Sequence, residues 1–419
     1  MPVMNSGPRP TGLVPNARLR REVSLPLLVL YGLGTTVGAG IYALTGEVAG
    51  SAGSRAPLSF LLAAALAGIT ALGFAELAGR LPKAAGEAVF VEHAFHSRVL
   101  TTSVGMVVIA AGVIACAAIL NAFGGYVAEL VDAPRWLLIV GLVGVLGGLA
   151  ASGVKESVTA AAVFTAVEIV GLLLVVWAGR ASFGAVGGRF GDLVGPPDSV
   201  DAWGGVLGGA FLAFFAFLGF EDIDSVAEET HAASRNLPRA ILLTLAITTV
   251  LYMAVSAIAV LEVEPSVLGN SDAPFTLIYQ RSGGNPDIIS FIAALAMVNG
   301  ALVQLVMIPR VVYGLSNLGL VPAWIGAVSH RTHTPVRATT VGIALVTALA
   351  LGLGLGPLAR LTSAATMAIF IAINLALIVI KRRDGATPTF HVPMWIPFVG
   401  IVASAAMFLA ESVRILDGG

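Results

Sequence analysis

Apolar runs of about 20 residues recur along the whole chain, and this feature constrains the fold more than any other. Hydrophobic residues make up 57% of the 419 positions, whereas charged residues make up only 11%. A soluble domain carries charged residues at about a quarter of its positions, so this chain has too few to cover a surface that faces water. The sequence therefore predicts an all-α integral membrane protein.

Eleven membrane-spanning helices are predicted from these runs. Their approximate bounds are 25–49, 57–78, 98–129, 136–151, 155–179, 203–229, 238–262, 286–318, 336–355, 357–381 and 395–416. With the N-terminus inside the cell, the 23 Lys and Arg residues, those near the ends of spans included, divide sixteen to seven in favour of the cytoplasmic side. Because this excess follows the positive-inside rule, we expect a multi-pass protein of the cytoplasmic membrane with a cytoplasmic N-terminus.

Glycines interrupt the first predicted span where a helix should be most regular. Residues 33–46 read LGTTVGAGIYALTG, and each glycine inside a helix costs roughly 1 kcal/mol relative to alanine. In one interpretation, the glycines let a neighbouring helix pack closely. In the other, the helix unwinds at Gly38 and Gly40, and its free N–H groups meet an anionic group such as a substrate carboxylate.

A matching interruption in the sixth span favours the second interpretation. Residues 211–225 read FLAFFAFLGFEDIDS, with Gly219 followed by three acids. The breaks are five spans apart, so a second five-helix unit would enter the membrane from the opposite side, and such paired breaks indicate a transporter's central site. We expect Asp222 and Asp224 to lie in the first turn of the inner half-helix, where its dipole favours acids. For Glu221, a structural and a functional role remain open.

This symmetry divides the chain into five segments. We expect a disordered cytoplasmic tail at 1–24, a first five-helix repeat at 25–179, an extracellular loop at 180–202, a second, inverted five-helix repeat at 203–381, and an additional C-terminal transmembrane helix at 382–419.

Five motifs occur in order along the chain. They are GTTVGAGI (34–41), AELAGRLPKAAGEAVFVEHAF (75–95), FAFLGFE (215–221), AEE…RNLPRAI (227–241) and NGALVQLVMIPRVVYGLSNLGLVP (299–322). Together they resemble the signatures of the amino acid–polyamine–organocation (APC) superfamily. The resemblance implies the bacterial leucine-transporter fold, with two inverted five-helix repeats and broken helices 1 and 6, and alternating access for small amines, mostly amino acids. Many members end with a twelfth helix, which is not predicted here.

The resemblance also implies a substrate site at the two breaks. Backbone N–H groups of Gly38, Ala39 and Gly40 would bind the substrate's α-carboxylate. Carbonyls around Phe215 and Leu218 would receive its α-amino group, and Phe215 holds the position of the family's gating aromatic residue. The complete set of candidate substrate-binding residues is Thr35, Thr36, Gly38, Ala39, Gly40, Ile41, Phe215, Leu218, Gly219 and Glu221.

Glu168 in the fifth span departs from the family's pattern. Relatives that are proton-linked or sodium-independent often have Lys here, so the charge is reversed. Glu168 shares one helical face with Ser157, Ala161, Thr165 and Gly171, and this face of small and polar residues should point into the bundle. A protonated structural acid is one interpretation. Ionisable residues at membrane depth are functional candidates by default, so we favour a role in proton coupling.

The sequence therefore predicts a secondary transporter that moves amino acids by alternating access with a proton as the coupling ion. A sodium site is disfavoured, because Asn299 and Gly300 stand where paired hydroxyls would complete its cage. The alternatives are a carrier of cationic amino acids or polyamines, an exchanger that needs no ion and, more distantly, a channel. No enzyme is expected, since G-x-S-x-G, H-E-x-x-H and Walker-type motifs are absent from the sequence.

The expected partners are the lipid bilayer, a small-molecule substrate and H⁺. Cys116 is the only cysteine, so a cysteine metal cluster is excluded, and neither a cofactor nor a metal ion is expected. The net charge of −1 gives no basis for a nucleic-acid partner. The oligomeric state is open.

Overall fold

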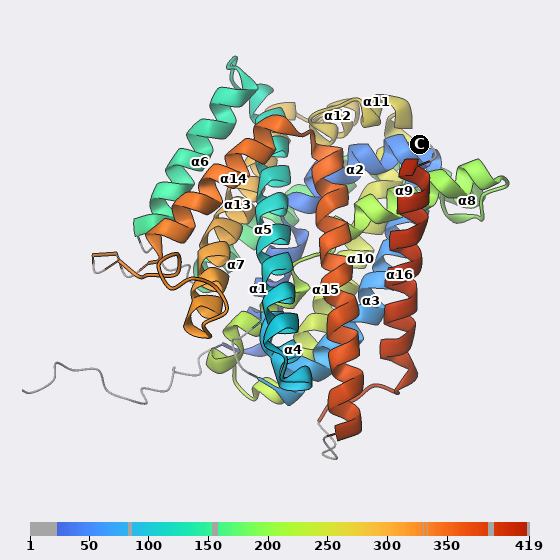
Figure 1. Cartoon of the computed structure of the whole chain (residues 1–419). Coiled ribbons are helices and arrows are strands. Elements are labelled where there is room, and N and C mark those ends of the chain that lie inside the picture. The colour runs from blue at the N-terminus through green and yellow to red at the C-terminus, as the bar shows by residue number, and fades with distance from the viewer. Residues whose placement is uncertain are drawn as a thin grey trace, which may run out of the picture.

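Helices make up almost all of the computed structural model (Figure 1), which describes residues 23–82, 86–152, 158–329, 331–332, 334–383 and 389–416. In chain order the α-helices are α1 (Leu25–Val37), α2 (Ala39–Ala52), α3 (Ala56–Arg80), α4 (Gly86–Phe95), α5 (Arg98–Ala128), α6 (Arg135–Ser152), α7 (Val158–Ala178), α8 (Phe183–Val194), α9 (Val200–Ala216), α10 (Ala233–Glu262), α11 (Pro265–Gly269), α12 (Pro274–Arg281), α13 (Pro286–Asn317), α14 (Val336–Gly352), α15 (Leu355–Arg383) and α16 (Trp395–Leu416). Three 3₁₀ helices complete the set: η1 (Gly53–Arg55), η2 (Gly179–Ser182) and η3 (Phe220–Glu229).

Most of the long helices are apolar enough to cross a membrane, which confirms the predicted all-α, multi-pass fold. The described part of the chain contains nine such stretches. The first, Leu25–Arg80, includes two of the predicted spans, and α14 is a shorter apolar helix that corresponds to another. Most of the predicted tail, residues 1–22, lies outside the described residues.

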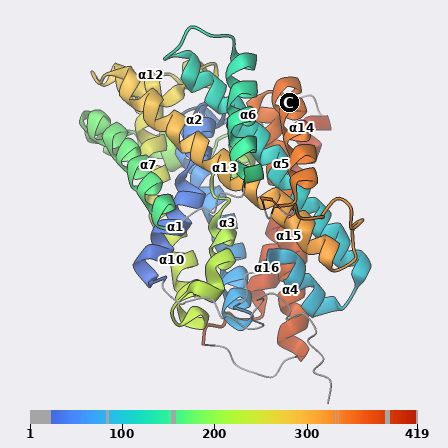
Figure 2. The same cartoon turned by 90° about the vertical axis from the view of Figure 1, so that its left-hand side faces the viewer.

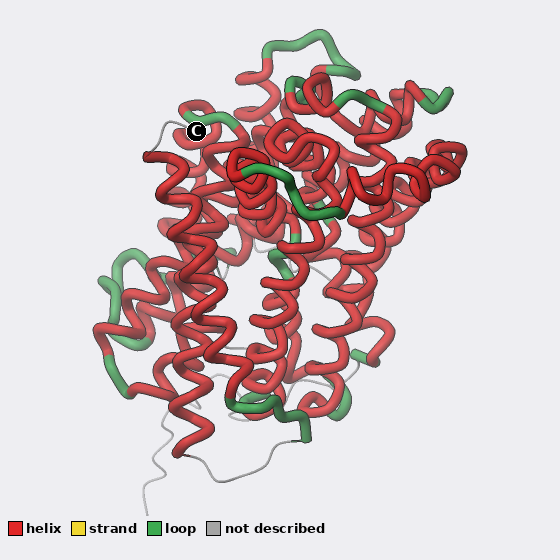
Figure 3. The backbone as a smooth tube through the Cα atoms, turned by 90° about the vertical axis from the view of Figure 1, so that its right-hand side faces the viewer, coloured by secondary structure: helices red, strands yellow, loops and turns green. Residues whose placement is uncertain are grey.

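The long helices run side by side between two ends of the molecule (Figures 1 and 3). One end carries α11 and α12, and the opposite end carries α4 (Figure 1). α1 lies toward the α4 end and α2 toward the α11 end, so the first span is one interrupted helix that crosses the bundle (Figure 2). A backbone bridge between Val23 and Thr230 joins the start of α1 to the end of η3.

Glycines in α2 explain why this half-helix packs tightly at the α11 end. A Cβ on Gly46 would lie 2.6 Å from the Leu268 carbonyl oxygen, and one on Gly50 would lie 3.0 Å from the Gly269 Cα. Small residues let membrane helices approach this closely. The packing interpretation of the glycines therefore holds for this part of the first span.

Glu76 of α3 fixes the α4 end of the bundle. Its buried carboxylate accepts hydrogen bonds from Arg80 Nη2 at 2.7 Å, from Lys381 Nζ at 2.7 Å and from the Val392 N–H at 2.8 Å. A buried carboxylate with this many donors is a structural acid that joins α3 to α15 and to the segment before α16.

Candidate functional site

The first break separates α1 from α2. α1 ends at Val37 and α2 begins at Ala39, with Gly38 between them at φ −50° and ψ −132°. No side chain caps the N-terminus of α2. The N–H groups of Ala39, Gly40 and Ile41 have no partner within the helix, because the first turn of a helix lacks acceptors. These N–H groups and the positive end of the helix dipole favour an anion at this point.

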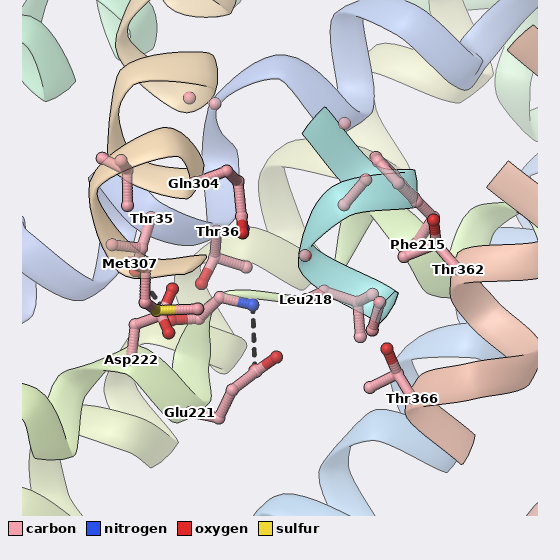
Figure 4. Close-up of a pocket in the computed structure, with 18 of the residues that line it drawn as sticks. Thr35, Thr36, Phe215, Leu218, Glu221, Asp222, Gln304, Met307, Thr362 and Thr366 are labelled. Atoms are coloured by element: carbon pink, nitrogen blue, oxygen red, sulfur yellow. Dashed lines mark hydrogen bonds between the residues drawn. The ribbon is translucent and has the colours of Figure 1, made fainter. Parts of the chain in front are cut away.

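The second break lies between α9 and η3. After Ala216 the chain tightens, and the N–H groups of Phe217 and Leu218 each donate to a carbonyl three residues earlier at 3.1 Å. Gly219 follows at a φ of +113°, a conformation that favours glycine. Its N–H donates to Glu221 Oε2 at 2.9 Å (Figure 4). A side chain of the protein therefore caps this break.

The position of Asp224 differs from the expected one. It lies in the second turn of the inner half-helix, because this element is a 3₁₀ helix that begins at Phe220 and has three residues per turn. The first turn holds Glu221 and Asp222. The Asp224 side chain is buried, and its Oδ2 has no hydrogen-bond partner among the described residues.

The two breaks are in direct contact. Thr35 Oγ1 at the end of α1 donates to the Gly219 carbonyl oxygen at 2.7 Å. The Tyr252 hydroxyl of α10 lies 2.8 Å from the carbonyl oxygens of both Thr36 and Ala216, one on each broken span. The unwound parts of spans one and six are therefore held together as one unit.

A pocket lies where the breaks meet (Figure 4). Nine of the candidate substrate-binding residues line it: Thr35, Thr36, Gly38, Ala39, Gly40, Phe215, Leu218, Gly219 and Glu221. Ile41 is the exception, since its side chain is fully buried and does not appear in the lining. Residues that are about 180 positions apart in the chain, and that the sequence placed in one site, therefore line one pocket.

Three further helices supply most of the remaining lining, and Gly300 is the one residue among them that the sequence analysis named, though not as part of the substrate site. The lining residues are Val108, Ala111, Gly112, Ala115 and Ile119 of α5; Gly300, Val303, Gln304 and Met307 of α13; and Thr362, Thr366 and Ile369 of α15. On each helix they recur at spacings of three or four residues, which places them on one face. Small and apolar residues at this spacing occur equally at helix–helix contacts, so the pattern alone does not reveal a pocket.

A second cavity, of about 480 Å³, continues from the pocket toward α4. The two share Glu87, Val108, Glu221, Asp222 and Met307 in their linings. Burial raises the pKa of the Glu87 carboxyl on α4, and a hydrogen bond to its own backbone opposes this shift in part. The described lining of neither cavity includes a residue of α11 or α12.

Glu168 of α7 lies beside the first break. Its side chain is fully buried, and its Oε1 accepts a hydrogen bond from Asn299 Nδ2 at 3.2 Å. Its Oε2 has no partner among the described residues, and a Cβ on Gly38 would lie 3.9 Å from this oxygen. The Tyr42 hydroxyl donates to the Glu168 carbonyl at 2.7 Å, not to the carboxyl. Unlike Glu76, Glu168 is a buried acid with one unsatisfied oxygen.

The face of α7 that carries Glu168 points into the bundle. Thr165 and Gly171 are buried, whereas Val163 and Val170 on other faces are exposed. The predicted face also included Ser157, which lies outside the described residues. Within the described ranges, no group of three or more His, Cys, Asp or Glu side chains is placed to hold a metal ion.

Comparison with known families gives a match over nearly the whole chain. A family model described as "Amino acid permease" matches residues 24–414.

Individual proteins that are similar to this chain are carriers by name. The branched-chain amino acid permease BcaP of Bacillus subtilis (strain 168) is 28% identical, over 93% of this chain and 88% of that protein. The vacuolar cationic amino acid transporter 2 of Arabidopsis thaliana is 30% identical over 87% of this chain, which spans 60% of that longer protein. A methylthioribose transporter of Bacillus subtilis (strain 168) is 27% identical, over 92% of this chain and 86% of that protein.

Proposed function

The chain belongs to the amino acid permease family of the APC superfamily, and we propose that it is a secondary transporter that couples the movement of amino acids to protons. The family consists of permeases, not enzymes. The proposed location is the cytoplasmic membrane, with a cytoplasmic N-terminus, because the Lys and Arg residues concentrate on that side. The proposed framework is two inverted five-helix repeats, 25–179 and 203–381, whose first helices carry the breaks.

One observation carries the substrate assignment: two half-helix ends of opposite polarity face the same pocket. The N-terminus of α2 offers free N–H groups to a carboxylate. The C-terminal turn of α9, with Phe215 and Leu218 in the pocket lining, offers carbonyl oxygens to an ammonium group. A zwitterionic α-amino acid has both groups on one carbon, so it matches both ends at once.

Glu168 supplies the proton coupling in this proposal. Its unsatisfied Oε2 lies beside Gly38, where the substrate carboxylate is proposed to bind. An ionised Glu168 would repel that carboxylate across a short distance of low dielectric constant, whereas a protonated Glu168 does not. Proton and substrate therefore favour each other's binding, and such coupling is reciprocal.

Alternating access explains the difference between the two ends of the molecule. At the α11 end, α2 packs against Leu268 and Gly269, while at the α4 end the pocket continues into the cavity of about 480 Å³. We assign this arrangement to an inward-facing state, with the α4 end in the cytoplasm. In the outward-facing state, the broken helices would separate from α11 and close the inner cavity.

Uptake by protein in liposomes tests the proposal. The wild type should concentrate a labelled amino acid mixture only when a pH gradient is imposed, and an uncoupler should abolish this accumulation. Glu168→Gln keeps the shape but removes the titratable group, so it should equilibrate or exchange substrate without concentrating it. Glu129→Gln, an exposed acid at the end of α5, is the matched control. If wild type and Glu168→Gln behave alike, Glu168 is structural and the protein is a uniporter or exchanger.

A carrier of cationic amino acids or polyamines is the second candidate. Glu87, Glu221 and Asp222 line the pocket, and a basic side chain would neutralise them. The cationic amino acid transporter among the similar proteins fits this candidate. Competition by lysine, arginine and putrescine decides the question, since none of them should compete if the substrates are neutral.

A further inference from the structure

Gln304 of α13 has a free hydrogen-bond acceptor in the substrate pocket. Its side chain extends from α13 toward the centre of the pocket (Figure 4). Its Oε1 is buried and has no hydrogen-bond partner among the described residues. Because a buried carbonyl oxygen without a partner destabilises a protein, the native chain is expected to keep one only where something else satisfies it.

The surroundings of this oxygen are otherwise apolar and small. A Cβ on Gly112 would lie 3.2 Å from Gln304 Oε1 and 3.2 Å from Ile308 Cγ1, so the oxygen rests against the bare backbone of α5. The neighbouring lining residues on the two helices are Val108, Ala111, Ala115, Val303 and Met307. Gln304 Oε1 therefore faces an otherwise apolar part of the lining between α5 and α13.

Several other polar groups in the pocket already have partners or lie at the breaks. Thr35 donates to the Gly219 carbonyl, and Thr362 donates to the Leu358 carbonyl at 3.0 Å. The described lining contains no Lys, Arg or His, so it offers no positive side chain to a substrate. Gln304 thus differs from its neighbours, because it presents an unused acceptor away from the two half-helix ends.

We infer that Gln304 determines side-chain specificity, and that its Oε1 accepts a hydrogen bond from a donor at the end of the substrate's side chain. This inference rests on the proposed amino acid transport. The α-carboxylate and α-amino group occupy the breaks, and the side chain lies between α5 and α13. The substrate class is an amino acid whose side chain is an apolar stem that ends in an amide, hydroxyl or ammonium donor. Acidic side chains are excluded by the carboxylates of the lining.

Uptake of single labelled amino acids into liposomes tests the inference. Glutamine and lysine represent neutral and cationic donors, leucine represents an apolar side chain, and glutamate represents an acidic one. Gln304→Leu removes the acceptor at similar volume. It should lower the ratio of uptake of the preferred donor substrate, glutamine or lysine, to uptake of leucine by about tenfold or more. Gly112→Ala keeps the Gln304 side chain, but the new Cβ would crowd its Oε1 and displace it slightly. This variant should therefore lose less of the preference for the donor substrate over leucine.

Phe291→Leu is the matched control, because Phe291 is an exposed apolar residue of α13 that lines neither cavity. It should alter uptake of all substrates by similar factors and leave the preference intact. The inference is overturned if wild type prefers leucine to both donors, or if Gln304→Leu retains the wild-type preference. If wild-type protein is monodisperse but takes up none of the amino acids, the proposed amino acid transport itself is overturned.

Discussion

The two helix breaks both interrupt a span, but the hydrogen-bond partners of their backbone N–H groups differ. At the second break, the Gly219 N–H donates to Glu221 Oε2 two residues later, so the chain supplies its own anion. At the first break, no side chain caps the N-terminus of α2. The first break is therefore left open to an external anion. The second is closed on its N–H side and presents the carbonyls of α9.

This difference assigns separate tasks to the two breaks. An open helix N-terminus at membrane depth is tolerated only where it lines a cavity, and the pocket reaches Gly38, Ala39 and Gly40. A capped break is stable without a ligand, and we propose that it serves as the fixed partner against which the substrate's ammonium group is positioned. The predictions below test this division, beginning with the largest effect.

Gly219→Ala should have the largest effect, because it destroys the contact between the breaks. Alanine is strained at a φ of +113°, by roughly 1–2 kcal/mol for left-handed backbone, and its Cβ would overlap the Thr35 backbone. We expect loss of uptake and of the monodisperse peak in size-exclusion chromatography. Gly68→Ala in α3 is the control, since its new Cβ meets no atom within 4 Å. Normal uptake by Gly219→Ala would show that the breaks function without this contact.

Substrate analogues should distinguish the open break from the capped one. Replacing the α-carboxylate by a carboxamide removes charge-assisted hydrogen bonds to α2 and should weaken competition by about 100-fold. Removing the α-amino group deletes charge-assisted hydrogen bonds to carbonyls that are already partly satisfied, as the Phe215 carbonyl is by the Leu218 N–H, so it should weaken competition by about tenfold. Competition against labelled substrate in liposomes measures both. A larger loss for the second analogue would reverse the assignment of the two breaks.

Tyr252→Phe should loosen both breaks without removing either. The hydroxyl lies 2.8 Å from two buried carbonyl oxygens, and its loss should lower the free energy of unfolding by about 1–3 kcal/mol. We also expect weaker substrate binding, because the two half-helix ends become less well fixed. Tyr126→Phe, whose hydroxyl donates to the Tyr42 carbonyl away from the break contact, should lower thermal stability alone. Equal substrate affinity in the two variants would contradict this role of Tyr252.

Substitution of Glu221 should give the smallest effects if this residue is mainly a cap. Glu221→Gln retains an oxygen that accepts from the Gly219 N–H, so uptake should stay within about twofold of wild type. Glu221→Ala removes the acceptor and should lower the free energy of unfolding by about 1 kcal/mol. Thermal unfolding and uptake report the two quantities separately. Loss of transport in Glu221→Gln would show that the charge acts on substrate or proton.

The sequence predicted the breaks because their signals are local. Gly38 and Gly219 stand out inside apolar runs, and Glu168 stands out as a charge at membrane depth. The 3₁₀ form of η3 was not predictable, because the pattern of residues that follows Gly219 suits an α-helix and a 3₁₀ helix equally. Gln304 was missed for a related reason: one polar residue in a span acquires meaning only when its unpaired oxygen is seen in the pocket.

The pocket walls were equally hidden in the sequence. α5, α13 and α15 contribute small and apolar residues whose spacing is that of any packed membrane helix. Only the arrangement of helices that are distant in sequence separates lining positions from packing positions. Ile41 is the opposite case. It belongs to the motif that predicted the site, but its side chain is buried and does not line the pocket.

Substrate-induced proton binding tests the coupling of Glu168 to the open break most directly. Purified protein in weakly buffered detergent solution is mixed with its amino acid substrate, and a pH-sensitive dye reports proton uptake. The account predicts uptake of up to about one proton per bound substrate by wild type and none by Glu168→Gln, since binding of proton and carboxylate is linked. Substrate binding without proton uptake, or equal uptake by the variant, would contradict it.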